Sequence, residues 1–228
     1  MIWIKPLVVL LLIFFGFILF IALFFKDELK ATREKDPAAQ GYLQIILMYS
    51  GLHALIAYRI SHKLWNMKMF FLARWVSQIA RFFTGIEIHP GAVIGKGLFI
   101  DHGMGVVIGE TSVLGDNVTL YQGVTLGGTG KETGKRHPTL GDNIVVGAGA
   151  KILGSIDIGS NSYIGANAVV IHPVPVNSTV VGVPGHITKQ DGKKLDIILA
   201  HSRIGDPIMQ DIDDLSARIE ALEKKLNR

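Results

Sequence analysis

An aliphatic residue recurs at every sixth position over much of the second half of the chain. This spacing fits neither the 3.6-residue period of an amphipathic helix nor the two-residue alternation of a strand. It is typical of a solenoid of short parallel strands, in which one aliphatic side chain per repeat points into the axis and a glycine often follows at the corner. The series slips by two residues once and is interrupted once, and its members are Ile88, Ile94, Ile100, Val106, Ile108, Leu114, Leu120, Leu126, Leu140, Val146, Ile152, Ile158, Ile164, Val170 and Val176.

Three such repeats complete one triangular turn of roughly eighteen residues, so the series predicts about five turns. A β-sandwich with evenly spaced strands is the alternative, but it does not explain the unbroken six-residue spacing over residues 140–176. The predicted fold class is therefore mainly β with α. We expect a parallel β-helix over residues 86–187, with helical segments before and after it.

Residues 7–25 form an unbroken apolar run of 19 residues. As a helix the run would extend about 28 Å, close to the thickness of a bilayer core. Basic residues are more frequent in residues 26–35 than before the run, so the positive-inside tendency would place the rest of the chain in the cytoplasm. A cleaved signal peptide is the alternative, but its stronger positive charge would precede the run. We expect residues 1–35 to form a transmembrane anchor and a linker.

Residues 36–85 are predicted to be a short helical region. Asp36-Pro37 has the character of a helix start, and Thr84-Gly85 that of a helix end. Apolar residues recur at helical spacing over residues 42–65 and again over residues 67–83. Interspersed polar side chains argue against a second membrane span. This region is too small to bury much surface alone, so we expect it to pack on the first turns of the solenoid.

Residues 188–228 form a tail in which the six-residue series has ended. Its aliphatic residues follow heptad spacing with charges between them, and they are Ile212, Leu215, Ile219, Leu222 and Leu226. Three tails held together by a trimeric solenoid would be concentrated enough to form a coiled coil. One amphipathic helix packed on its own subunit explains the same pattern equally well.

The composition excludes some functions. The chain contains no cysteine, so it has no disulfide, thiolate metal site or thiol nucleophile. Its formal net charge of +4 is mild and comes without a long basic run, so nucleic acid is not an expected partner.

Asp101-His102 is a polar pair where the repeat would place small residues. Glu87 precedes His102 by slightly less than one turn of roughly eighteen residues, an offset that would bring it to a neighbouring position one turn away. A carboxylate near an imidazole can fix its tautomer and stabilise the imidazolium form. The pair is a candidate for acid–base chemistry, although a solvated corner histidine is the alternative.

The interruption of the repeat at residues 127–138 reads Gly-Gly-Thr-Gly-Lys-Glu-Thr-Gly-Lys-Arg-His-Pro. Loops extruded from a rigid scaffold often carry function. The segment does not match the phosphate-binding pattern of a P-loop. His89, His102 and His137 could together hold zinc, but their spacing does not favour a metal site, and we expect none.

Taken together, Asp101-His102, Gly127-Gly128-Thr129-Gly130-Lys131 and Arg136-His137-Pro138 resemble the bacterial serine O-acetyltransferases, a family of hexapeptide-repeat acyltransferases. These motifs are much more specific than the repeat alone, and the resemblance covers residues 36–187. The segments that carry it are residues 36–38, 53–60, 88–90, 100–103, 106–111, 123–131, 136–138, 147–154 and 182–184.

The resemblance implies a left-handed parallel β-helix that assembles as a homotrimer, with active sites between subunits. It also implies transfer of the acetyl group of acetyl-CoA to the hydroxyl of L-serine, which yields O-acetylserine and CoA for cysteine biosynthesis. Direct attack by a hydroxyl needs a base, because serine is a weak nucleophile at its own pKa.

The family's residue roles transfer to matching positions of this chain. By resemblance, His102 is the general base and Glu87 its acidic partner, although many members have aspartate there. The implied roles of the others are Asp36 and Asp101 for the serine ammonium, Arg136 for the serine carboxylate, His137 as a second imidazole at the substrate, and Gly128, Ala148 and Ala166 as small residues along the pantetheine of acetyl-CoA.

The chain departs from the family at both ends. An apolar segment stands in place of a longer helical N-terminal region, so we expect a trimer rather than a hexamer. The chain ends Asn227-Arg228 instead of with isoleucine, which makes a partnership with O-acetylserine sulfhydrylase doubtful. Feedback inhibition by cysteine is a further expectation from the family.

Two other functions remain open. A hexapeptide acetyltransferase could act on a sugar or another hydroxyl at the membrane, and a trimer of this kind could be a non-catalytic scaffold. An amino-acid substrate is favoured by Asp36, Asp101 and Arg136, because the two carboxylates can pair with its ammonium group and the guanidinium with its carboxylate. The histidine with its nearby carboxylate disfavours a scaffold.

Overall fold

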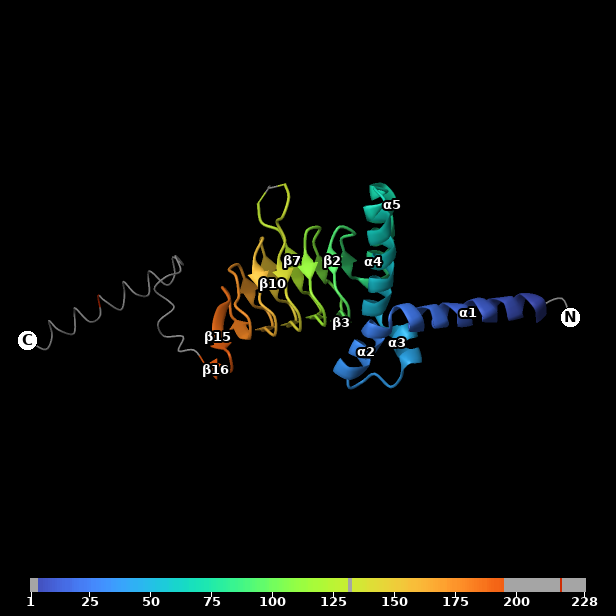
Figure 1. Cartoon of the computed structure of the whole chain (residues 1–228), viewed down its shortest axis with the longest axis horizontal. Coiled ribbons are helices and arrows are strands. Elements are labelled where there is room, and N and C mark those ends of the chain that lie inside the picture. Colours follow the sequence, from blue (N-terminus) through green and yellow to red (C-terminus); the bar gives the residue numbers. More distant parts are fainter. Residues whose placement is uncertain (1–3, 131–132, 195–217, 219–228) are drawn as a thin grey trace, which may run out of the picture. The chain divides into compact units, whose positions relative to one another are not determined.

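The computed structural model describes residues 4–130, 133–194 and 218. A group of helices precedes a β-helix (Figure 1), which confirms the predicted mainly β solenoid with a helical region before it. The helices are α1 (Ile4–Phe24), α2 (Lys26–Lys35), α3 (Tyr42–Met48), α4 (Ser50–Asn66) and α5 (Phe70–Thr84).

The helical region differs from its prediction at two places. Asp36 does not begin a helix but caps the C-terminus of α2, where its N–H donates to the carbonyl of Thr32 at 3.0 Å. Residues 42–65 form two helices rather than one continuous helix. Tyr49 ends α3 and begins α4, because its backbone is extended, with φ −90° and ψ 106°.

Helix α1 contains most of the apolar run that the sequence predicts to be a membrane segment. Among the described residues, no helix taken singly has both the length and the apolar character needed to cross a membrane. Two bent helix pairs meet these criteria by length and composition: Val8–Phe24 with α2, bent by 80°, and α3 with α4, bent by 68°.

The helices form a small core of their own. The C-terminal end of α1 contributes to it, together with the first half of α2 and the facing sides of α3 and α4. Its buried members are Ile21, Phe25, Leu29, Ala39, Ile45, Ile46 and Leu52. This core holds the segment between α2 and α4 against the rest of the helical region.

Cations on α2 and α4 tie these helices to the solenoid. Nζ of Lys35, the last residue of α2, donates to the carbonyl of Asn117 and to the hydroxyl of Thr119, both at 3.0 Å. The guanidinium of Arg59 on α4 donates to the carbonyl of Ile94 at 2.7 Å. Burial lowers the pKa of Lys35, as expected for an ammonium group enclosed by protein. Both ends of the connection that carries Tyr49 are therefore anchored.

The solenoid consists of three sheets whose strands follow one another around each coil. The first sheet contains β1 (Glu87–Ile88), β4 (Val107–Ile108), β7 (Thr125–Gly127), β10 (Lys151–Leu153) and β13 (Val169–Val170). The second contains β2 (Val93–Ile94), β5 (Val113–Leu114), β8 (Thr139–Leu140) and β11 (Asp157–Ile158). The third contains β3 (Phe99–Asp101), β6 (Thr119–Tyr121), β9 (Val145–Val146), β12 (Tyr163–Ile164), β14 (Ser178–Val181), β15 (His186–Gln190) and β16 (Lys193–Lys194).

The aliphatic series forms the solenoid core, as the six-residue period predicts. Every member from Ile88 to Val170 is buried. Val176 is an exception, because it is 52 % exposed while Val174 and Val180 are buried in its place. Val180 pairs with Ile164, so the last coil is shorter than three regular repeats require. Two prolines flank Val174, and the strand ladder is reduced there to an isolated bridge.

The coils differ in length, and this affects the site. In the first coil Ile88 pairs with Ile108, which makes this coil longer than three regular repeats. Leu114 pairs with Leu140, so a later coil is longer still and contains the extruded loop, as the interruption of the repeat predicts. The domain division of residues 1–35, 36–85, 86–187 and 188–228 stays a prediction, and the heptad positions of the tail lie outside the described residues.

Candidate active site

His102 lies at the corner that follows β3, and we call the corner between the third and first sheets the His102 corner. The backbone of His102 is left-handed, with φ 58°, which turns the chain sharply after Asp101. The imidazole is 75 % exposed, and its Nε2 lies 3.8 Å from Oδ1 of Asp101. The ring is therefore open to a ligand and has one carboxylate close by.

Asp36 lies between α2 and α3, and each of its carboxylate oxygens accepts one hydrogen bond. The N–H of Ala38 donates to Oδ1 at 2.8 Å, and the phenol of Tyr49 donates to Oδ2 at 2.5 Å. Burial raises the pKa of Tyr49 to about 12, and the hydrogen bond to Asp36 and the charges of Asp36 and Asp101 act in the same direction. Tyr49 is therefore hydrogen-bonded to Asp36 and experiences the charge of Asp101, the other acid that the sequence predicts to bind an ammonium group.

The start of α4 packs against the end of β3 and the corner that carries His102. The hydroxyl of Ser50 donates to the carbonyl of His102 at 3.3 Å. Gly51 allows this approach, because an added Cβ would lie 2.4 Å from the carbonyl oxygen of Ile100. Asp36, Asp101 and His102 are thus connected through one short segment of the helical region.

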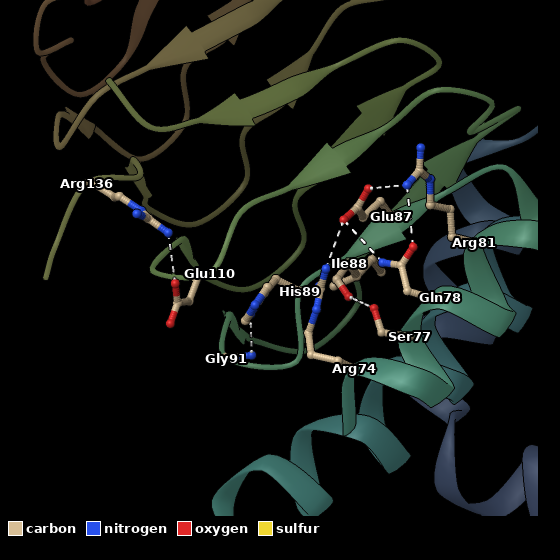
Figure 2. A network of polar contacts seen from close by, with 10 residues as sticks. All are labelled: Arg74, Ser77, Gln78, Arg81, Glu87, Ile88, His89, Gly91, Glu110 and Arg136. Carbon is tan, nitrogen blue, oxygen red and sulfur yellow. Dashed lines mark hydrogen bonds and ion pairs between the residues drawn. The ribbon is translucent and has the colours of Figure 1, made fainter. Parts of the chain in front are cut away.

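Glu87 begins β1 and is held by α5 (Figure 2). Its carboxylate lies 3.2 Å from Arg81 Nη1 and 3.6 Å from Arg74 Nη2, and it accepts a weak hydrogen bond from Gln78 at 3.5 Å. Among the described residues these are its polar side-chain contacts, and His102 is not one of them. The first coil is longer than the period of roughly eighteen residues, and Glu87 pairs in the strand register with Val107, five residues after His102.

Arg136 and His137 end the extruded loop at a different corner. We call the corner between the first and second sheets the Arg136 corner. Arg136 Nη2 lies 2.9 Å from Oε2 of Glu110, which follows β4 (Figure 2). Thr111 Oγ1 accepts hydrogen bonds from the backbone N–H groups of Arg136, at 3.0 Å, and His137, at 3.1 Å. One threonine therefore holds the end of the loop against the preceding coil.

His137 is a buried side chain with a defined hydrogen-bond partner. The backbone N–H of Thr111 donates to Nδ1 at 3.2 Å, so Nδ1 is an acceptor and the remaining proton of the neutral ring is on Nε2. Burial, and secondly the positive charge of Arg136, lowers the pKa of His137. The imidazole is thus kept neutral, with one N–H available to donate.

The small residues predicted to lie along acetyl-CoA are divided between the two corners. Ala148 follows β9 and Ala166 follows β12, so both are at the His102 corner, one coil apart. The N–H of Asn167 donates to the carbonyl of Ala148 at 2.8 Å, which keeps these coils in register. Gly128 follows β7 and therefore lies at the Arg136 corner.

The candidate residues of one chain thus form two separate groups. Asp36, Asp101 and His102 gather at the His102 corner, whereas Arg136 and His137 gather at the Arg136 corner. Because the first sheet of the prism separates these corners, one chain does not bring the two groups together.

Some residues at these corners were not singled out from the sequence. Tyr49, Ser50 and Thr111 act through hydrogen bonds between segments distant in the chain, and no local pattern signals such contacts. Glu110 and Thr111 lie in residues 106–111, one of the segments that carry the family resemblance, and this resemblance is the sequence signal that could have identified them.

The zinc alternative finds no support at these corners. His89 and His137 are at the Arg136 corner and His102 is at the other. Within the part of the chain that the structure describes, no group of three or more histidine, aspartate or glutamate side chains could hold a metal ion.

A coiled prism of six-residue repeats, with an exposed histidine at one corner and an extruded loop at another, defines the class of hexapeptide-repeat transferases. Residues 137–172 match the family described as bacterial transferase hexapeptide (six repeats). The chain is 60 % identical over 195 residues to the serine acetyltransferase of Staphylococcus aureus (strain Mu50), an alignment that covers 86 % of this chain and 92 % of that protein. The chain therefore belongs to the serine acetyltransferase family, which confirms the predicted family and enzyme class.

Solved structures of serine acetyltransferases are also similar to this chain. The crystal structure of Neisseria gonorrhoeae serine acetyltransferase has a TM-score of 0.72 and 46 % identity, with coverage of 75 % of this chain and 66 % of that one. A structure of the same protein in complex with serine has a TM-score of 0.70 and 46 % identity, with coverage of 73 % of this chain and 68 % of that one. The chain thus spans about two thirds of the solved chains.

Proposed function

We propose that the chain transfers the acetyl group of acetyl-CoA to the hydroxyl of L-serine and releases O-acetylserine and CoA. The observation that carries this proposal is the grouping of Asp36 and Asp101 with His102. Two carboxylates suit a primary ammonium, and an exposed imidazole next to them suits a hydroxyl on the same small molecule. The serine complex of the related Neisseria gonorrhoeae enzyme supports the choice of substrate.

His102 is the general base in this mechanism. Its imidazole takes the hydroxyl proton while the serine oxygen bonds to the carbonyl carbon of the thioester. The tetrahedral intermediate then collapses, the C–S bond breaks, and the imidazolium returns the proton to the departing thiolate. No acyl-enzyme forms.

Glu87 is proposed as the acidic partner that stabilises this imidazolium. It begins β1, which pairs with β4, the strand that follows the His102 corner. In the structure its charge is already engaged by Arg74 and Arg81. Acting on His102 would therefore require Glu87 to give up one of these ion pairs, which are partly exposed and weak.

A homotrimer would complete the site. The His102 corner of one copy would face the Arg136 corner of the next, so that Arg136 meets the serine carboxylate and His137 donates from Nε2. Acetyl-CoA would lie between the copies, along Ala148 and Ala166 of one and Gly128 of the other. The separation of the two groups in a single chain supports this arrangement. The handedness that we propose for the coil, as the family resemblance implies, is left-handed.

We further propose that α1 anchors the enzyme in a membrane, with the catalytic domain in the cytoplasm. The apolar run of residues 7–25 supports this, as do exposed apolar side chains on α1, among them Leu12 at 66 % and Phe15 at 64 %. The protein should then stay with membranes after carbonate extraction. Release into the soluble fraction would contradict the anchor and leave the catalytic proposal unaffected.

The catalytic proposal is tested by release of free thiol from acetyl-CoA with L-serine as acceptor. Sugars and 3-hydroxypropionate, which lacks the ammonium, are the comparison acceptors. We expect rapid release with L-serine and little with the others. Preference for a sugar would overturn the proposal in favour of a different hydroxyl acceptor.

A further inference from the structure

The dipeptide Tyr49-Ser50, at the break between α3 and α4, contacts both parts of the His102 corner. Tyr49 reaches back to the carboxylate of Asp36, with a 2.5 Å hydrogen bond. Ser50 reaches forward to the carbonyl of His102, at 3.3 Å. These contacts connect residues 13 and 52 positions apart, so the break is the structural link between the acid and the base.

The bond from Tyr49 fixes the orientation of Asp36 without neutralising it. Ala38 N–H holds one carboxylate oxygen and the phenol holds the other, so rotation of the carboxylate would break one bond or both. Each oxygen keeps a second lone pair for a ligand. A phenol carries no charge, whereas Glu87 at the start of β1 is already paired with two arginines. Asp36 is therefore the carboxylate that is oriented and still available to a cation.

We propose that Tyr49 is a positioning residue for the ammonium group of the amino-acid substrate, which it serves by fixing the orientation of the Asp36 carboxylate. This inference rests on the proposed function. It assigns Tyr49 no contact with the reacting hydroxyl, so its effect belongs to serine binding. The phenol can fill this role at all pH values at which the enzyme is folded, because its pKa of about 12 keeps it protonated.

Tyr58 provides a matched control within the same helical region. Its phenol donates to the carbonyl of Ala92 at 2.7 Å, and the residue is 2 % exposed. Burial raises its pKa to about 12 as well. Each of the two tyrosines thus donates one hydrogen bond, but the acceptor of Tyr58 is a backbone carbonyl and not a substrate-binding acid.

The test uses the full-length enzyme and steady-state thiol release. Tyr49→Phe removes only the hydroxyl, and we expect the KM for L-serine to rise about tenfold, as for loss of a hydrogen bond to a charged group. The kcat and the KM for acetyl-CoA should change little. Tyr58→Phe should lower the Tm and leave the KM for serine unchanged.

A double-mutant cycle adds a readout that a structural role would not move. Because Tyr49 acts through Asp36, Tyr49→Phe should add little to the KM increase already caused by Asp36→Asn. Additive effects, or an unchanged KM for serine in Tyr49→Phe, would overturn the positioning role. These outcomes would leave the proposed function intact, because that function is tested by thiol release from acetyl-CoA with L-serine and the wild-type enzyme.

Discussion

The carbonyl oxygen of Ile100 lies so close to Gly51 that a Cβ at residue 51 would be 2.4 Å away from it. This contact joins the first turn of α4 to β3, the strand that ends at Asp101 immediately before His102. Because the neighbouring atoms are rigid backbone, an added methyl group would have to push the helix and the strand apart.

We therefore expect Gly51→Ala to lower both the stability and the kcat. Overpacking of this kind costs about 1–3 kcal/mol, which would appear as a decrease in Tm. Displacement of His102 should lower the kcat further than the loss of folded protein explains. Gly41→Ala is the control, because nothing lies within 4 Å of the added Cβ there. Equal Tm and equal kcat in Gly51→Ala and Gly41→Ala would contradict close packing of α4 on the strand.

Thr111 offers a second test, at the Arg136 corner. Its hydroxyl accepts hydrogen bonds from the N–H groups of Arg136 and His137, so Thr111→Val leaves two backbone donors without that partner. We expect the KM for serine to rise about tenfold, because the loop end that carries Arg136 loosens. Thr188→Val removes a threonine hydrogen bond to the carbonyl of Thr179, between β15 and β14 at the opposite end of the third sheet from β3, and should leave the KM unchanged. A normal KM in Thr111→Val would show that the loop is held by other contacts.

His89 makes the stability depend on pH. Burial, and secondly the charge of Arg74, lowers its pKa to about 4, from an ordinary value near 6.5. The unfolded chain binds the proton first, so stability is fully present above about pH 6.5 and decreases as the pH falls toward about 4.

His89→Asn should make this decrease shallower. Asparagine cannot titrate in this range, but it can still accept the hydrogen bond that Gly91 N–H donates to Nδ1 of His89. The measurement is Tm between pH 7 and pH 4.5, with the exposed His172→Asn as control. Identical slopes for the wild type and His89→Asn would be the contrary result. His137 retains a slope of the same sign, so the variant should not become independent of pH.

The period of six was enough to predict the solenoid, because each coil must bury one aliphatic side chain per face. The prediction failed at Val176, where the coil is shorter than the period and Val180 takes the buried position. The number of residues in a coil depends on its corners and turns, and the spacing of aliphatic residues alone does not predict their lengths. The same limit applies to the register of Glu87, since the first coil is longer than the period predicts and Glu87 pairs with Val107.

The candidate site was predictable where residue types carry the chemistry. Asp101-His102 and Arg136-His137 stand out as polar pairs in an apolar repeat. The break at Tyr49 was not predictable, because the apolar pattern runs through it and the close approach of Gly51 to Ile100 joins segments that are distant in the sequence. The assignment of the two groups to different corners needed the strand order, which places residues on faces of the prism.

The central claim is that the imidazole of His102 accepts the proton of the serine hydroxyl. The direct test is thiol release from acetyl-CoA with L-serine by His102→Ala, with folding checked by Tm. The account predicts a loss of roughly 10²–10⁴-fold in kcat, the usual contribution of a general base. A folded His102→Ala enzyme that acetylates serine at the wild-type rate would contradict it.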